Sequence, residues 1–114
     1  MKILPLFLIM FSVMSATAGQ ARDAQTKPWT FLIFLNAHND LDSFSYTNLN
    51  DMEKIGSTDQ VNVVVQWASM KGGDTKRLLV TKDNDTTKVT SVPIETLSPV
   101  DMGSADELVN FIKW

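Results

Sequence analysis

Residues 29–35 restrict the fold of this chain more than any other segment. All of their side chains are apolar except that of Thr30, so a strand formed here would have no polar face. Such a run is typical of a strand that is covered on both faces, as in the parallel sheets of α/β proteins. Residues 36–40 are rich in turn formers and should end this strand.

A helix and a second strand are predicted to follow. In residues 41–55 the apolar side chains lie on one side of a helix, at Leu41, Phe44, Leu49, Met52 and Ile55. Asp40 or Asp42 can accept hydrogen bonds from the first turn, and Gly56 is placed to end the helix. The alternating apolar residues of 61–67 indicate a strand. Together these elements predict a βαβ unit with two parallel strands.

The remaining residues predict a hairpin and a covering helix. Residues 77–81 and 88–92 should pair around residues 83–85, and residues 93–99 should form an extended connection. Ser104 and Glu107 match a capping box at the start of the last helix. The apolar residues of that helix are Leu108, Val109, Phe111 and Ile112. Its apolar stripe reaches Trp114 with no helix-ending residue, which favours a domain that is cut short there.

The N-terminal residues predict an export signal. Lys2 supplies a positive charge, an apolar segment follows, and Ala16 and Ala18 have the spacing that a signal peptidase accepts, so that Gly19 would follow the cleavage site. The apolar segment is too short for a stable membrane span. We therefore expect a secreted or periplasmic protein with no membrane contact after cleavage. Residues 1–18 would be the signal peptide, 19–28 a flexible leader and 29–114 the folded part.

Composition excludes several classes of function. The 114 residues contain no Cys, which excludes a cysteine nucleophile, a zinc–thiolate site and an iron–sulfur cluster within this sequence. The formal net charge is −3 and the basic residues are scattered, so we expect no nucleic-acid partner. Glycine-rich phosphate loops are also absent from the sequence.

His38 is the one side chain whose charge would ordinarily change near neutral pH. With Asp40 or Asp42 and with Ser43 or Ser45 it could form a serine triad, but residues so close in sequence rarely converge in that way. A turn histidine followed by helix-capping aspartates explains the same residues better.

Two short segments carry side chains that could act as metal ligands. His38, Asp40 and Asp42 form the first, and Asp83, Asn84 and Asp85 the second. The second segment lacks the Gly and Glu of a calcium-binding loop, and solvated turn residues explain it better. Residues 84–86 also match a glycosylation sequon.

From about residue 29 to residue 114, the sequence resembles the clostripain family of cysteine peptidases, which have the caspase–haemoglobinase fold. The resemblance depends on the order and spacing of several stretches. They are residues 29–37 (WTFLIFLNA), 39–41 (NDL), 49–58 (LNDMEKIGST), 61–66 (VNVVVQ), 75–77 (TKR), 102–104 (MGS) and 108–114 (LVNFIKW).

The resemblance implies a partial caspase-like three-layer α/β sandwich, made of a βαβ unit, a hairpin and a covering helix. It also implies a cysteine endopeptidase that cleaves protein or peptide substrates after Arg or Lys. The family's catalytic His and Cys follow later strands, so no residue here takes either role. Calcium binding is suggested by the resemblance alone, and no cofactor is expected in this chain itself.

The turn formed by Asn36, His38, Asn39 and Asp40 would lie at the rim of the cleft in such an enzyme. Relatives usually have an acidic residue where this sequence has His38. The leading interpretation is an N-terminal fragment that is inactive alone and whose partner is the remaining part of the peptidase domain. A small exported binding module and an inactive remnant are the alternatives.

Overall fold

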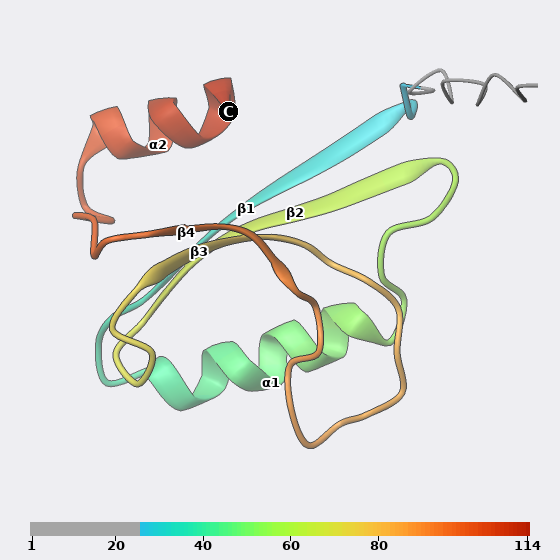
Figure 1. The fold of residues 1–114 in the computed structure, drawn as a ribbon, viewed down its shortest axis with the longest axis horizontal. Helices are drawn as coiled ribbons and strands as arrows, with labels where there is room; N and C mark the ends of the chain where they lie inside the picture. Colours follow the sequence, from blue (N-terminus) through green and yellow to red (C-terminus); the bar gives the residue numbers. More distant parts are fainter. Residues whose placement is uncertain (1–25) are drawn as a thin grey trace, which may run out of the picture.

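The computed structural model describes residues 26–114, and in this part the chain forms a four-stranded sheet with one helix on each face (Figure 1). The elements are, in order, β1 (Trp29–Ala37), α1 (Asp42–Glu53), β2 (Val61–Ser69), β3 (Thr75–Leu79), β4 (Pro93–Leu97) and α2 (Ala105–Lys113). The sheet order is β1-β2-β3-β4, in which β1 and β2 are parallel and the other two pairs antiparallel. The predicted α/β class, βαβ unit and three layers are confirmed.

The predicted export signal, with Lys2, Ala16, Ala18 and Gly19, lies outside the described residues, as does most of the predicted leader 19–28. Within the described residues, neither helix has the length and apolar character needed to cross a membrane.

The parallel pairing of β1 and β2 extends over the whole of both strands, from Trp29 opposite Val61 to Ala37 opposite Ser69. Alternate side chains of the sheet point toward α1 and form the main core with that helix. The buried members of this core are Ala37, Leu49, Val65, Trp67, Leu78 and Val80. The core therefore lies in the layer between the sheet and α1.

The predicted apolar side of α1 is only partly correct. Leu49 is buried and Met52 packs against the core, but Leu41, Phe44 and Ile55 are exposed. The buried side of the helix instead carries Ser45, Leu49 and Glu53. Two polar residues lie on this side because each has a buried partner, which sequence periodicity alone does not reveal.

Those partners come from β2 and from the long segment before β4. The Ser45 hydroxyl accepts a hydrogen bond from the indole Nε1–H of Trp67 at 2.9 Å. The Glu53 carboxylate accepts the backbone N–H groups of Thr90 and Ser91 at 3.0 and 2.6 Å. Glu53 is 1% exposed, and its ordered partners satisfy a carboxylate that would otherwise be costly to bury.

The predicted hairpin between residues 77–81 and 88–92 is wrong in its second strand. The strand that pairs with β3 is β4, so the connection between them runs over residues 80–92. Glu53 holds the N–H groups of Thr90 and Ser91, and these groups are therefore not available to a sheet. Pro93, predicted to lie in a connection, begins the edge strand β4, where its missing N–H costs little.

The start of α2 lies where the sequence predicts it, but the predicted capping box does not form. Ser104 occupies the N-cap position without a side-chain capping bond. Glu107 instead accepts a hydrogen bond from Gln66 at 2.8 Å and lies 3.6 Å from Arg77. Of the predicted apolar residues of this helix, Phe111 is buried, and the others remain exposed.

Gly56 follows α1 in a backbone conformation that favours glycine, with φ of 66°. A Cβ atom at this position would lie 2.3 Å from the backbone nitrogen of Lys82, which is far closer than atoms pack. Gly73, in the turn between β2 and β3, has a similar φ of 71° but no atom within 4 Å of such a Cβ. Backbone strain and steric overlap can therefore be separated by comparing these two glycines.

We expect Gly56→Ala to lower the free energy of unfolding by about 3 kcal/mol or more, because strain and overlap with the backbone add. Gly73→Ala should lower it by about 1–2 kcal/mol, through strain alone. Urea unfolding followed by far-ultraviolet circular dichroism measures both changes. Equal losses in the two variants would contradict the close approach of residues 56 and 82.

Candidate functional site

The carboxyl ends of parallel strands are where α/β proteins commonly bind ligands, because the loops there meet at one edge of the sheet. In the described residues, a cleft of about 330 Å³ lies at the carboxyl end of β1. Asn36 and His38 form one wall, and residues 100–103 of the connection into α2 form the other. We regard this cleft as the candidate functional site.

The turn after β1 is held by Asn39. Its amide nitrogen donates to the carbonyl of Asn36 at 3.2 Å, and its side-chain oxygen accepts the N–H of Leu41 at 2.9 Å. These bonds reverse the chain and place His38 at the tip, where its side chain is exposed. Of the four predicted rim residues, Asn36 and His38 line the cleft, Asn39 shapes the turn, and Asp40 is exposed outside it.

Asp101 lies on the opposite wall and was not identified from the sequence. Its carboxylate accepts the N–H of Gly103 at 2.8 Å, and its carbonyl accepts the N–H of Ser104 at 3.0 Å. These bonds form the turn that leads into α2. An Asp two residues before a Gly, just before a predicted helix cap, is the sequence signal that could have indicated this turn.

The lining of the cleft offers polar groups that could orient a ligand, but it contains no hydroxyl or thiol side chain. Imidazole, carboxylate, amide and thioether groups are present, whereas Ser, Thr, Cys and Lys are absent from the lining residues. An imidazole alone can transfer protons or polarise a substrate.

The serine-triad hypothesis finds no support. Ser45 is buried, and its hydroxyl donates to the carbonyl of Asp42 at 2.7 Å while it accepts from Trp67. Neither Ser43 nor Ser45 lines the cleft that contains His38. His38 and the serines therefore do not converge, and the turn interpretation describes them better.

The two segments with candidate metal ligands do not form a cluster. No group of three or more His, Cys, Asp or Glu side chains in residues 26–114 is arranged so that it could hold a metal ion. Both Asp42 carboxylate oxygens accept backbone N–H groups, from Met70 and Lys71.

In the second candidate segment, hydrogen bonds from the Thr87 hydroxyl and backbone N–H lower the pKa of Asp85 below its ordinary value. Asn84, the sequon residue, is exposed.

A buried polar network fixes α2, and with it one wall of the cleft. Arg77 of β3 is 6% exposed, donates to Gln66 at 2.7 Å and to Glu95 at 3.0 Å, and lies 3.6 Å from Glu107 of α2. Its guanidinium also lies 5.0 Å from the ring centre of Trp114. The buried charge is thus paired on several sides, as burial of an arginine requires.

Asp42 connects the two turns at this edge, because it begins α1 and holds the N–H groups of Met70 and Lys71 at 3.1 and 3.2 Å. We expect Asp42→Ala to raise the hydrogen-exchange rates of these two amides by about tenfold, since charge-assisted hydrogen bonds are lost. Nuclear magnetic resonance measures the rates. Asp40→Ala, at an exposed neighbour, is the control and should leave them unchanged; equal effects of the two variants would contradict the assignment.

Comparison with known proteins identifies solved structures that have a similar fold. No family model matches the chain, and no curated protein matches it. A B. fragilis cysteine protease structure has 18% sequence identity and a TM-score of 0.62, and the match covers 77% of this chain and 75% of that chain. Nearly equal coverage means that the two chains are similar in length.

The second similar structure is that of a secreted C11 cysteine protease from Bacteroides thetaiotaomicron, in complex with an irreversible peptide inhibitor. It has 25% identity and a TM-score of 0.62, again over 77% of this chain. The match spans only 25% of that protease. The described residues therefore have the fold of the C11, or clostripain-family, cysteine proteases, as the sequence resemblance implied.

Proposed function

We propose that this chain is the N-terminal part of an exported clostripain-like cysteine endopeptidase that cleaves protein or peptide substrates after Arg or Lys. The catalytic His and Cys would come from the remaining part of the peptidase domain, because this sequence contains no Cys. Such a peptidase needs a thiolate, an imidazole and an oxyanion site. The cleft at the carboxyl end of β1 would form one side of the substrate-binding region.

The unpaired edge of β1 carries this proposal. Among the described strands, β1 pairs only with β2, so the backbone groups on its other side have no sheet partner. Trp29, Phe31 and Leu32 are 67%, 58% and 43% exposed and lie on both faces of this strand. A long apolar edge is a ready site for another strand.

The other edge of the sheet is protected. β4 has five residues and begins with Pro93, which cannot donate a hydrogen bond. Short edge strands and proline are the devices by which proteins prevent unwanted strand pairing. The contrast supports continuation of the sheet beyond β1 and not beyond β4.

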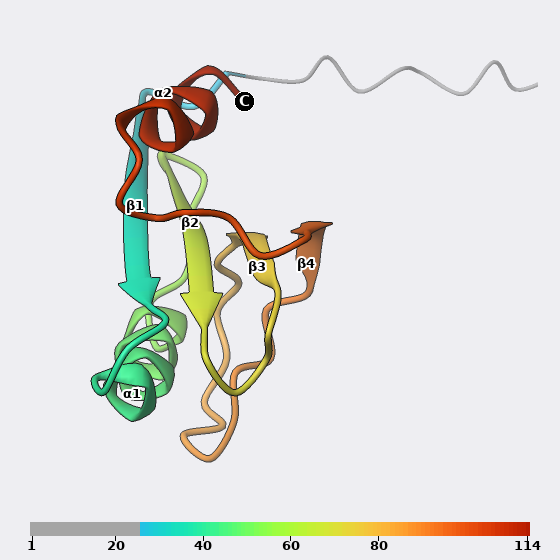
Figure 2. The same ribbon diagram turned by 90° about the vertical axis from the view of Figure 1, so that its left-hand side faces the viewer.

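The exposed side of α2 is also consistent with a continuing sheet. Figure 2 shows α2 near β1 and away from β4, and the rings of Phe34 and Phe111 lie 6.1 Å apart. Leu108, Val109 and Ile112 of this helix remain exposed. A strand added beside β1 would bring further apolar surface close to them.

The comparisons support the same proposal. The match to the secreted C11 protease leaves three quarters of that protein to supply other elements, and its bound peptide inhibitor favours a peptide substrate here. Secretion of that protease also supports export of this one.

Removing the apolar character of the β1 edge should suppress self-association. We expect the unmodified chain to associate through this edge, and Phe31→Lys/Leu32→Lys to sediment as a monomer, because charges on an edge strand oppose pairing. Sedimentation velocity measures the species. Ile55→Lys/Val92→Lys, at two even more exposed apolar positions outside β1, is the matched control and should associate like the unmodified chain. A monomeric unmodified chain would count against the proposed edge.

The chain alone should not hydrolyse fluorogenic peptides with Arg or Lys before the scissile bond, and a peptide chloromethyl ketone should not label it. Both results follow from the missing thiol. The His38→Ala variant is the control for any activity observed. Hydrolysis by the chain that is lost in His38→Ala would place catalysis in this part and overturn the proposal.

A further inference from the structure

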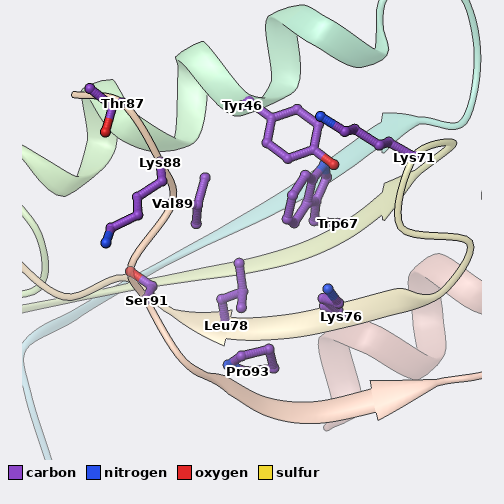
Figure 3. Close-up of a pocket in the computed structure, with 10 residues that line it drawn as sticks. All are labelled: Tyr46, Trp67, Lys71, Lys76, Leu78, Thr87, Lys88, Val89, Ser91 and Pro93. Carbon is purple, nitrogen blue, oxygen red and sulfur yellow. The ribbon is translucent and has the colours of Figure 1, made fainter. Parts of the chain in front are cut away.

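A second hollow, of about 380 Å³, lies beside α1 on the face of the sheet opposite α2 (Figure 3). Its walls come from α1, β2, the turn between β2 and β3, β3, the long segment before β4 and the first residue of β4. The volume is that of a pocket for a small molecule or a single large side chain. It lies apart from the candidate cleft, with which it shares no lining residue.

The floor of this hollow is apolar and fixed. Trp67 and Leu78 are 5% and 1% exposed. The ring of Tyr46 meets the Trp67 ring edge-on, with centres 4.8 Å apart. Ser45 holds the Trp67 indole, and the Tyr46 hydroxyl forms a hydrogen bond with Ser69 at 2.9 Å. Trp67 and Leu78 thus form a rigid base that is almost fully covered, and Tyr46, Val89 and Pro93 provide the more accessible apolar lining of the hollow.

Three lysines surround this floor, each from a different segment. Figure 3 shows Lys71, Lys76 and Lys88 on separate sides of the hollow, with Trp67, Val89 and Leu78 between them. The ammonium group of Lys71 lies 5.8 Å from the Tyr46 ring centre, and that of Lys76 lies 5.9 Å from the Trp67 ring centre. The aromatic rings therefore hold two of the charges at the rim.

These charges are poorly compensated. The lining residues include no Asp or Glu. Among the described ion pairs, only Lys88 has an acidic partner, Asp85 at 3.6 Å. Asp42 lines an adjoining hollow that shares Lys71, so its carboxylate and that of Asp85 offset part of this charge and leave three lysines against two carboxylates. A local excess of positive charge thus occurs in a chain whose net charge is −3.

We infer that this pocket, defined by Tyr46, Trp67, Leu78 and the three lysines, binds an aromatic anion: a flat ring that carries a phosphate or carboxylate group. The ring would lie against the accessible apolar lining of Tyr46, Val89 and Pro93, above Trp67, and the anionic group would neutralise the ammonium groups. Lysine ammonium groups bind either kind of anion as point charges. The inference is independent of the proposed peptidase function.

Phenyl phosphate is the primary probe, and the indole N–H resonance of Trp67 in the full chain is the readout. The chain has three tryptophans, so the indoles of Trp29 and Trp114 serve as internal controls. We expect a saturable shift of the Trp67 resonance alone, weakened by salt because the attraction is electrostatic. Inorganic phosphate and benzyl alcohol, which lack the ring or the charge, should bind much more weakly.

Lys71→Gln/Lys76→Gln should weaken phenyl phosphate binding by about tenfold, since two partly exposed charge contacts are lost. Lys82→Gln, at an exposed lysine outside the pocket, is the matched control and should bind like the unmodified chain. An unchanged midpoint of urea unfolding shows that each variant keeps the fold, because the Trp67 resonance itself is expected to move when the Lys76 ammonium group over its ring is removed.

A second probe, N-acetylphenylalanine, distinguishes a ligand that carries a carboxylate from one that carries a phosphate. Tighter binding of this carboxylate indicates a peptide carboxyl terminus, and tighter binding of phenyl phosphate indicates a phosphorylated ring; each result supports the pocket. No shift of Trp67 with either compound would overturn the inference. Equal losses of affinity for phenyl phosphate in Lys71→Gln/Lys76→Gln and in Lys82→Gln would also overturn it.

Discussion

Two neighbouring residues of β2, Gln66 and Trp67, hold the two helices on opposite faces of the sheet. Successive side chains of a strand point to opposite faces, so a buried pair in the central strand reaches both layers. Trp67 donates to Ser45 of α1, and Gln66 donates to Glu107 of α2. Gln66 also accepts from Arg77 of the next strand. The positions of the cleft wall and of the lysine-lined pocket both depend on this pair.

The two edges of the sheet differ in a way that fits the proposed N-terminal part of a larger peptidase domain. The β1 edge is long and apolar, whereas the β4 edge is short and begins with proline. Pairing with a further strand is therefore favoured at the β1 edge alone. That side also bears the turn with His38. Elements added there would reach the same cleft, where parallel strands end together. The proposed function would thus account both for the unpaired edge of β1 and for a cleft whose lining has no hydroxyl or thiol side chain.

The sequence predicts the elements of the described fold well, because their signals are local. The apolar run of β1, the alternation of β2 and the helix-ending Gly56 all appear where expected. Predictions fail where a buried polar contact overrides periodicity. Glu53 accepts the backbone N–H groups of Thr90 and Ser91, so a polar residue lies on the buried side of α1. Residues 88–92 therefore do not pair with β3, and β4 pairs with it instead. Glu107 pairs with Gln66 and Arg77 instead of capping its helix.

The candidate site was predictable in part for the same reason. The turn residues Asn36 and His38 follow a recognisable strand, and they do line the cleft. Asp101 lies 63 residues after His38 in the sequence, and only the packing of α2 brings the two to one cleft. The three lysines of the other pocket come from separate segments and form no sequence pattern.

Reading the coding DNA downstream of the Trp114 codon tests the central claim most directly. The account predicts that the frame continues through a further apolar strand followed by a His, and then through another strand followed by a Cys. A stop codon directly after Trp114 would contradict it, because no catalytic dyad would then exist to complete the cleft.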